Sequence, residues 1–118
     1  MNVYLVNAFS FNMLPANEVG WSLRSQERTT AEARRLSAGA VSGVGHGDMA
    51  TLFAAVLGRE VELCRSTLTL AADDSLLLGQ YSGSRLPPGT TELPAGAQIR
   101  WIWIDIYAGA AVDPDPVG

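Results

Sequence analysis

The sequence has few of the residues that disulfides, metal clusters and membrane spans need. It contains one cysteine, Cys64, and one histidine, His46, which excludes an internal disulfide and a mixed His/Cys metal cluster. No apolar run reaches the roughly 18 residues of a membrane span, so no contact with a membrane is expected. The start, MNVYLVNAF, has neither the basic region nor the cleavage site of a secretory signal. We therefore expect a cytoplasmic protein whose chemistry uses no metal and no cofactor.

Positive charge is also scarce. The formal net charge is −4, and all eight basic residues are arginine. Binding to duplex nucleic acid depends on clustered basic residues that neutralise phosphates, so a duplex is not the expected partner. A small anion remains compatible, because the planar guanidinium group can hold two phosphate oxygens.

The length and composition indicate one globular domain. The chain has 118 residues, of which 47% are hydrophobic and 17% are charged. This is enough to bury one core and too little for two independent ones. We expect the folded domain to span residues 1–107. The tail 108–118, AGAAVDPDPVG, is expected to be disordered.

Apolar patterns predict about five strands. Residues 2–9 are almost continuously apolar, as in a strand covered on both faces, whereas residues 19–25 alternate between apolar and polar. Residues 61–70 and 76–81 are predicted to form the two arms of a hairpin that turns at 71–74. Residues 98–107 alternate most regularly and predict a long strand.

Two helices are predicted between these strands. Thr29 and Thr30 suit the N-cap of a short helix that ends near Leu36. Residues 48–57 carry apolar residues at spacings of three and four, and Gly58 suits the C-cap. Residues 37–45, SAGAVSGVG, have the composition of a flexible linker. The predicted fold is an α/β or α+β domain with a mixed sheet of about five strands, flanked on one face by two or three helices.

A long loop separates the last two predicted strands. Residues 82–97, SGSRLPPGTTELPAGA, include three prolines and three glycines. Long ordered loops are often functional, so this segment is a candidate lid.

His46 stands between Gly45 and Gly47 at the start of the second predicted helix. A single histidine there is often only a capping or packing residue. Helix starts, however, present free backbone amides and the positive end of the helix dipole, which together suit a phosphate. Histidine is also a common general acid in enzymes, so His46 is a candidate for that role.

Two further residues could share that site. Arg85 in the long loop could balance the charge of a phosphate, and Ser10 directly follows the first strand, where ligands of α/β sheets gather. The simpler readings are a solvated loop arginine and a turn hydroxyl. The GVGHG segment lacks the lysine of a phosphate-binding P-loop and does not predict a nucleotide fold.

Several stretches resemble one family in their order and spacing. NVYLVNAFSFNML (2–14), GHGDMATLFAAVLG (45–58), the predicted hairpin after it and SGSRL (82–86) are similar to the viral anti-CRISPR ring nucleases of type III CRISPR immunity and their cellular relatives. The resemblance implies a homodimer that binds cyclic tetra-adenylate across its two-fold axis. It also implies metal-independent cleavage to linear di-adenylate with a 2′,3′-cyclic phosphate, which switches off the CRISPR signal.

The resemblance also implies roles for single residues. His46 corresponds to the catalytic histidine, Arg85 to the arginine that holds the scissile phosphate, and Ser10 to the serine near the phosphate and ribose. Ligand contacts are expected from further residues of the matching stretches and of the loop: Asn7, Phe9, Asn12, Gly45, Gly47 and Glu92.

One departure from the family leaves the activity open. Acidic residues are expected two and three positions after the matched arginine, but Pro87 and Pro88 stand there, and Glu92 is the nearest substitute. A cyclic-oligonucleotide sponge or sensor is therefore the alternative to an enzyme. A third alternative is an interaction domain that exposes Trp101 and Trp103, although these residues fit the core or a dimer seam better.

Overall fold

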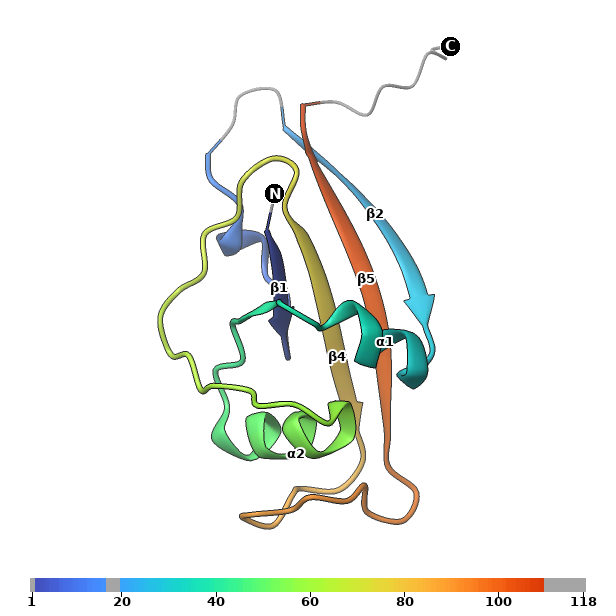
Figure 1. Cartoon of the computed structure of the whole chain (residues 1–118). Coiled ribbons are helices and arrows are strands. Elements are labelled where there is room, and N and C mark those ends of the chain that lie inside the picture. Colours follow the sequence, from blue (N-terminus) through green and yellow to red (C-terminus); the bar gives the residue numbers. More distant parts are fainter. Residues whose placement is uncertain (1, 17–19, 110–118) are drawn as a thin grey trace.

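A five-stranded mixed sheet forms the centre of the protein. The computed structural model describes residues 2–16 and 20–109, and Figure 1 shows their arrangement. The strands lie in the order β2-β5-β4-β1-β3. The elements, in chain order, are β1 (Val3–Val6), the 3-10 helix η1 (Phe11–Met13), β2 (Trp21–Arg28), α1 (Thr30–Leu36), β3 (Val41–Ser42), α2 (Gly47–Leu57), β4 (Ser75–Ser82) and β5 (Gln98–Ala108).

The sheet combines a parallel half with an antiparallel half. β1 pairs in parallel with both β3 and β4. β5 pairs antiparallel with β4 on one side and with β2 on the other. The prediction of one α/β domain with a mixed sheet of about five strands and two or three helices is therefore confirmed, with two α-helices among the described residues.

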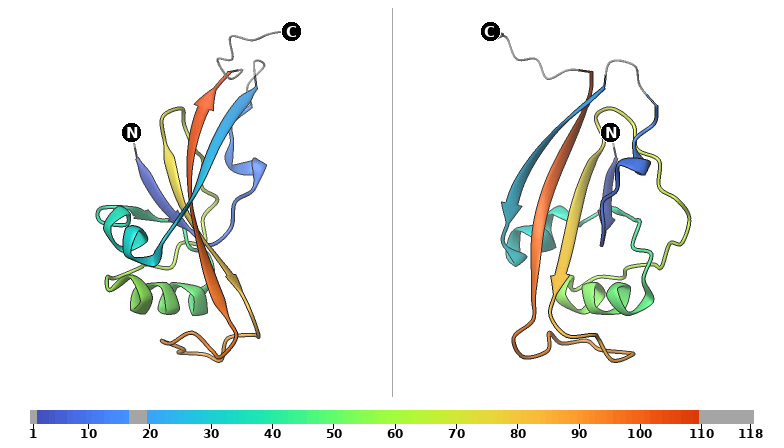
Figure 2. Two further views of the ribbon diagram at one scale, coloured as in Figure 1. Left: turned by 90° about the vertical axis from the view of Figure 1, so that its right-hand side faces the viewer. Right: turned by 180° about the vertical axis from the view of Figure 1, so that it is seen from behind.

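The apolar run of β1 is explained by cover on both faces of the sheet. Leu5 packs into one core cluster, together with residues of α2, and the next residue, Val6, packs into a second cluster on the opposite face. Both helices lie on the first face, and the segment around η1 lies on the other, as the two views in Figure 2 show. Phe9, Met13, Leu14, Leu68 and Leu70 help to fill that second face.

The two helices begin and end largely as predicted. Thr29 caps α1 and forms a capping box with Glu32, while Gly58 ends α2 in the left-handed conformation that glycine favours. The C-terminal ends of the two helices are also joined by two arginine side chains, one from α1 and one from the residue that follows Gly58. Arg34 Nε donates to the Val56 carbonyl at 2.9 Å, and Arg59 Nη2 donates to the Arg34 carbonyl at 2.8 Å.

Aromatic packing dominates the core beneath α2. The rings of Phe53 and Trp101 lie 5.0 Å apart and are tilted by 56°. Both side chains are fully buried, and Gly79 of β4 provides the space that they occupy. The expectation that Trp101 belongs to the core is confirmed, so it is not part of an exposed interaction face. Trp103 is half-buried against the same cluster, and its Nε1 donates to Asp105 Oδ1.

The predicted hairpin is wrong in its first arm. Residues 61–70 form no strand, because their backbone bonds elsewhere: Cys64 N donates to the Val44 carbonyl and Leu70 N to the Met13 carbonyl, each at 2.8 Å. β4 pairs with β1 and β5 instead. The predicted linker 37–45 is wrong in part as well, because Val41–Ser42 is strand β3.

Three smaller differences concern element ends. β1 ends at Val6 rather than at residue 9, and β2 continues to Arg28 rather than ending at residue 25. In the predicted tail, Ala108 ends β5, and Gly109 N donates to the Gly20 carbonyl at 2.7 Å. Residues 110–118 lie outside the described residues. In the part of the chain that the structure describes, no helix combines the length and apolar character needed to cross a bilayer.

Candidate functional site

The carboxyl ends of three neighbouring strands meet at one edge of the sheet. β3, β1 and β4 run parallel, and the loops that follow them begin at residues 43, 7 and 83. Figure 1 shows α2 and the loop 83–97 at this end of the sheet. Ligands of α/β proteins bind beyond such strand ends, so this edge is the candidate site.

The loop that carries His46 is fixed from both sides. Asn7 Oδ1 accepts a hydrogen bond from Gly45 N at 3.1 Å, and Gly43 N donates to the Leu5 carbonyl at 2.7 Å. Val44 between them is fully buried. Asn7, one residue beyond β1, therefore holds the segment from which His46 emerges.

The glycines of this loop serve different purposes. A Cβ on Gly43 would lie 3.0 Å from Val6 Cγ1, and one on Gly45 would lie 3.3 Å from the Cys64 carbonyl oxygen. A Cβ on Gly47 would meet nothing within 4 Å. Gly43 and Gly45 thus let the loop pack against the protein itself, whereas only Gly47 faces open space that a ligand could enter.

His46 is the N-cap residue of α2, but its imidazole caps nothing. The residue has extended backbone angles, its side chain makes no capping hydrogen bond, and it is exposed. Within the described ranges, the amides of Gly47, Asp48 and Met49 have no acceptor, and the first helical bond runs from Ala50 N to the His46 carbonyl. The imidazole thus stands free beside amides that can receive an anion.

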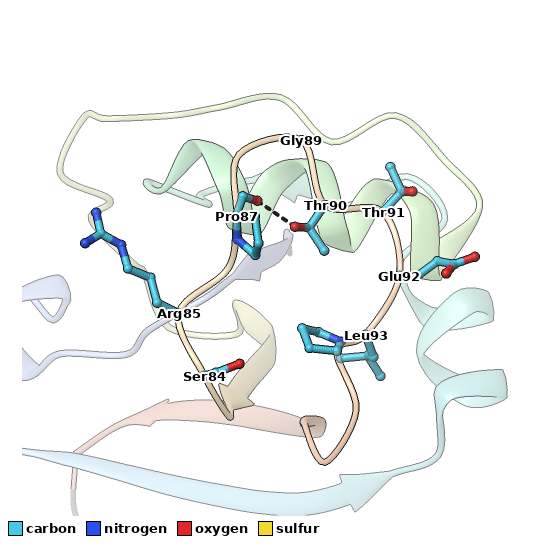
Figure 3. Close-up of a pocket in the computed structure, with 9 residues that line it drawn as sticks. Ser84, Arg85, Pro87, Gly89, Thr90, Thr91, Glu92 and Leu93 are labelled. Atoms are coloured by element: carbon cyan, nitrogen blue, oxygen red, sulfur yellow. Dashed lines mark hydrogen bonds between the residues drawn. The ribbon is translucent and has the colours of Figure 1, made fainter.

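Arg85 lies in the loop after β4, at the same end of the sheet. Its side chain is exposed, and the ion pairs found among the described residues, Arg28–Glu32 and Arg100–Glu27, do not include it. It borders a pocket of about 530 Å³ that is formed by residues of the loop: Ser84, Arg85, Pro87, Gly89, Thr90, Thr91, Glu92, Leu93 and Pro94. In Figure 3 the guanidinium extends away from the rest of that loop.

The loop 83–97 also lies along α2. Thr91 of the loop and Gly47, the neighbour of His46, line one pocket of about 690 Å³. The loop therefore connects the Arg85 side of the edge with the His46 side.

One family model matches most of the chain. The model of the STIV B116-like family matches residues 3–96. The chain belongs to the STIV B116-like family. This is the viral anti-CRISPR ring nuclease family that the sequence resembles, so the predicted family is confirmed.

A solved structure shares the fold of this STIV B116-like protein. B116 of Sulfolobus turreted icosahedral virus superposes with a TM-score of 0.68 at 21% sequence identity. The match covers 89% of this chain and 99% of that chain. No curated protein sequence matches the chain significantly.

In the STIV B116-like chain, Ser10 does not lie with His46. Ser10 Oγ accepts from Asn12 N at 3.2 Å and caps η1, which lies on the sheet face opposite α2. Phe9 packs against the core of that face and meets Phe11 edge to face, with ring centroids 5.8 Å apart. Of the residues predicted after the first strand, Asn7 is therefore the one that contacts the His46 loop.

Glu92 lies apart from Arg85. Both residues border the loop pocket, but Figure 3 shows their side chains at opposite ends of it and pointing away from each other. One tight turn lies between them, in which Thr90 N donates to the Pro87 carbonyl, and a second follows Glu92, in which Ala97 N donates to the Pro94 carbonyl. In this conformation Glu92 therefore does not replace the acidic residues that were expected at positions 87 and 88, next to Arg85.

Tyr81 is a residue of this edge that the sequence did not mark as functional. It lies near the end of β4, and its hydroxyl donates to the Ser84 carbonyl at 2.6 Å. A tyrosine at the end of a strand predicts packing. No pattern in the sequence predicts that its hydroxyl donates a hydrogen bond to the loop that follows the strand. In residues 2–16 and 20–109, no group of three or more His, Cys, Asp or Glu side chains is placed to hold a metal ion.

Proposed function

We propose that this protein is a metal-independent ring nuclease that binds cyclic tetra-adenylate across a homodimer and cleaves it to linear di-adenylate with a 2′,3′-cyclic phosphate. One observation supports this most directly. In a member of this family, an unengaged imidazole, His46, stands beside free helix amides at the sheet edge where Arg85 emerges.

The chemistry needs no other catalyst. The ribose 2′-hydroxyl attacks the neighbouring phosphorus and releases its proton to water. A bond from the 2′-oxygen to phosphorus forms, and the bond from phosphorus to the 5′-oxygen breaks. Protonated His46 gives its proton to the departing 5′-oxygen, a step that typically contributes about 10² to 10⁴ in rate. Arg85 and the amides after His46 hold the phosphate oxygens as negative charge accumulates on them.

The proposed site needs two subunits. Within one chain, Ser10 and Asn12 lie on the opposite face of the sheet from His46. They contribute to the same ligand only if a second subunit brings them to it. A two-fold dimer would also present two copies of His46 to opposite phosphates of a four-membered ring.

The assay is cleavage of labelled cyclic tetra-adenylate in the presence of EDTA. We expect multiple turnovers with the wild-type protein and a loss of at least about 100-fold with His46→Ala. Arg85→Ala should also lose activity. The matched control Arg24→Ala, on β2, should retain it, because Arg24 is an exposed arginine distant from this edge. A product with a free 3′-hydroxyl or activity that EDTA abolishes would contradict the mechanism, and sedimentation as a monomer would contradict the shared pocket.

A sponge or sensor is the second candidate. It is favoured by Pro87 and Pro88, where an acidic residue is expected, and by the distant position of Glu92. Stoichiometric binding of cyclic tetra-adenylate without linear product, unchanged by His46→Ala, would support it over the enzyme.

A further inference from the structure

Arg85 leaves the sheet through a segment that Tyr81 holds in place. Tyr81 is half-buried in β4, where it pairs with Ile99 of β5. Its hydroxyl reaches past the end of the strand and donates to the Ser84 carbonyl at 2.6 Å. The peptide group that accepts this bond is the one that joins Ser84 to Arg85.

Gly83 makes this contact possible. Its φ of +151° is one that residues with side chains rarely adopt. A Cβ there would lie 2.6 Å from Ala97 Cβ and 3.0 Å from the Tyr81 hydroxyl. Any side chain at this position would therefore push against the hydroxyl and against the other end of the loop.

The chain is fixed on the far side of Arg85 as well. Leu86 is buried, with 6% of its surface exposed, whereas Ser84 and Arg85 are exposed. The Arg85 backbone thus lies between a hydrogen-bonded peptide group and a buried anchor. A guanidinium whose backbone is already placed has less freedom to lose when it binds a phosphate.

We propose that Tyr81 is a positioning residue for Arg85 and acts through the Ser84 carbonyl. The inference rests on the proposed function, in which Arg85 holds the phosphate of the cyclic nucleotide. Tyr81 is not itself the proton donor to the ligand, because its hydroxyl hydrogen is committed to the Ser84 carbonyl.

The test compares Tyr81→Phe with Tyr107→Phe in the cleavage assay. Tyr107 is an exposed tyrosine at the other end of the sheet, so its variant controls for the loss of a hydroxyl alone. Loss of one net hydrogen bond changes a conformational equilibrium by about 2- to 12-fold. We expect kcat/KM of Tyr81→Phe to fall within that range, and Tyr107→Phe to match the wild type.

A double variant separates positioning from general structure. In single-turnover measurements on Arg85→Ala, adding Tyr81→Phe should have no further effect, because nothing remains to be positioned. An equal loss in the wild-type and Arg85→Ala backgrounds would overturn the inference, and so would full activity of Tyr81→Phe.

Hydrogen exchange distinguishes failure of this inference from failure of the proposed function. If the wild type neither cleaves nor binds cyclic tetra-adenylate, the proposed function fails. Tyr81→Phe should still raise amide exchange over residues 83–86, whereas Tyr107→Phe should not. If the wild type binds cyclic tetra-adenylate without cleaving it, the dissociation constant replaces kcat/KM as the readout. Unchanged exchange over residues 83–86 in Tyr81→Phe would overturn the inference in every case.

Discussion

Replacing Gly79 by alanine tests how tightly the core under α2 is packed. Gly79 is buried in β4, and the two large rings of the core lie against it. An added Cβ would lie 2.5 Å from Phe53 Cζ and 2.5 Å from Trp101 Cζ3. Carbon atoms in contact normally lie about 3.5 to 4.0 Å apart, so both rings would have to move by about 1 Å.

The expected loss of stability depends on whether the two rings can move away from the added methyl group. Phe53 and Trp101 are fully buried, so neither can turn out into solvent. Overpacking a core costs about 1–3 kcal/mol, and disturbing an aromatic pair costs about 0.5–1.5 kcal/mol. Alanine recovers about 0.5–1 kcal/mol because it is less flexible than glycine in the unfolded chain. The net loss should be about 2 kcal/mol, which lowers the melting temperature by about 8 °C in a domain of this size.

Thermal unfolding checks this value against a matched glycine. Gly47→Ala adds the same methyl group where nothing lies within 4 Å, at the first position of a helix. It should leave the melting temperature unchanged or raise it slightly. In Gly79→Ala, the further change Phe53→Leu should cost less than it does in the wild type, because it relieves the clash. Equal melting temperatures of Gly79→Ala and the wild type would refute the packing argument.

Three further predictions concern the rest of the fold. The Thr29 backbone amide donates to the Glu32 carboxylate and lowers the pKa of that carboxylate. Ionised Glu32 therefore stabilises the protein at pH values above its unfolded-state pKa. This contribution is lost as the pH falls through the lower pKa of the folded state. The gap between the melting temperatures of wild type and Glu32→Gln should therefore close in acid; a constant gap would contradict the assignment. Arg34→Ala and Arg59→Ala should each lower the free energy of unfolding in urea by about 1 kcal/mol. Arg24→Ala should leave it unchanged, because Arg24 forms no ion pair with any residue that the structure describes. Asp73 has a φ of 72°, so Asp73→Gly should raise the melting temperature or leave it unchanged, and a clear loss would show that its side chain matters more than backbone strain.

Local patterns in the sequence predicted the elements that carry them strongly. The caps at Thr29 and Gly58 and the alternation over residues 98–107 each depend on neighbours along the chain, and each appears in the structure. Strand β3 escaped prediction because it has two residues, too few for any period to show. It is a strand only because β1 offers it a parallel partner.

The candidate site was predicted in part for similar reasons. His46 and Arg85 follow strands or precede a helix, positions that can be recognised locally, and the parallel strand order brings both to one edge. The position of Ser10 depends on where the chain turns after Val6. The apolar side chains of Phe9, Met13 and Leu14 direct that turn, because they need burial on the second face of the sheet. Apolar residues in a loop indicate that the loop packs against the core. They do not indicate which face of the sheet the loop covers.

The exchange of arginine hydrogen bonds between α1 and α2 couples the last turns of the two helices. If the end of α1 frays, the hydrogen bond from Arg34 to the Val56 carbonyl at the end of α2 breaks. If the chain after α2 loosens, the hydrogen bond from Arg59 to the Arg34 carbonyl breaks. Neither helix end can open without weakening the other, so the pair should unfold in a single cooperative step. The last turn of α1 is thereby linked to the helix that begins directly after His46.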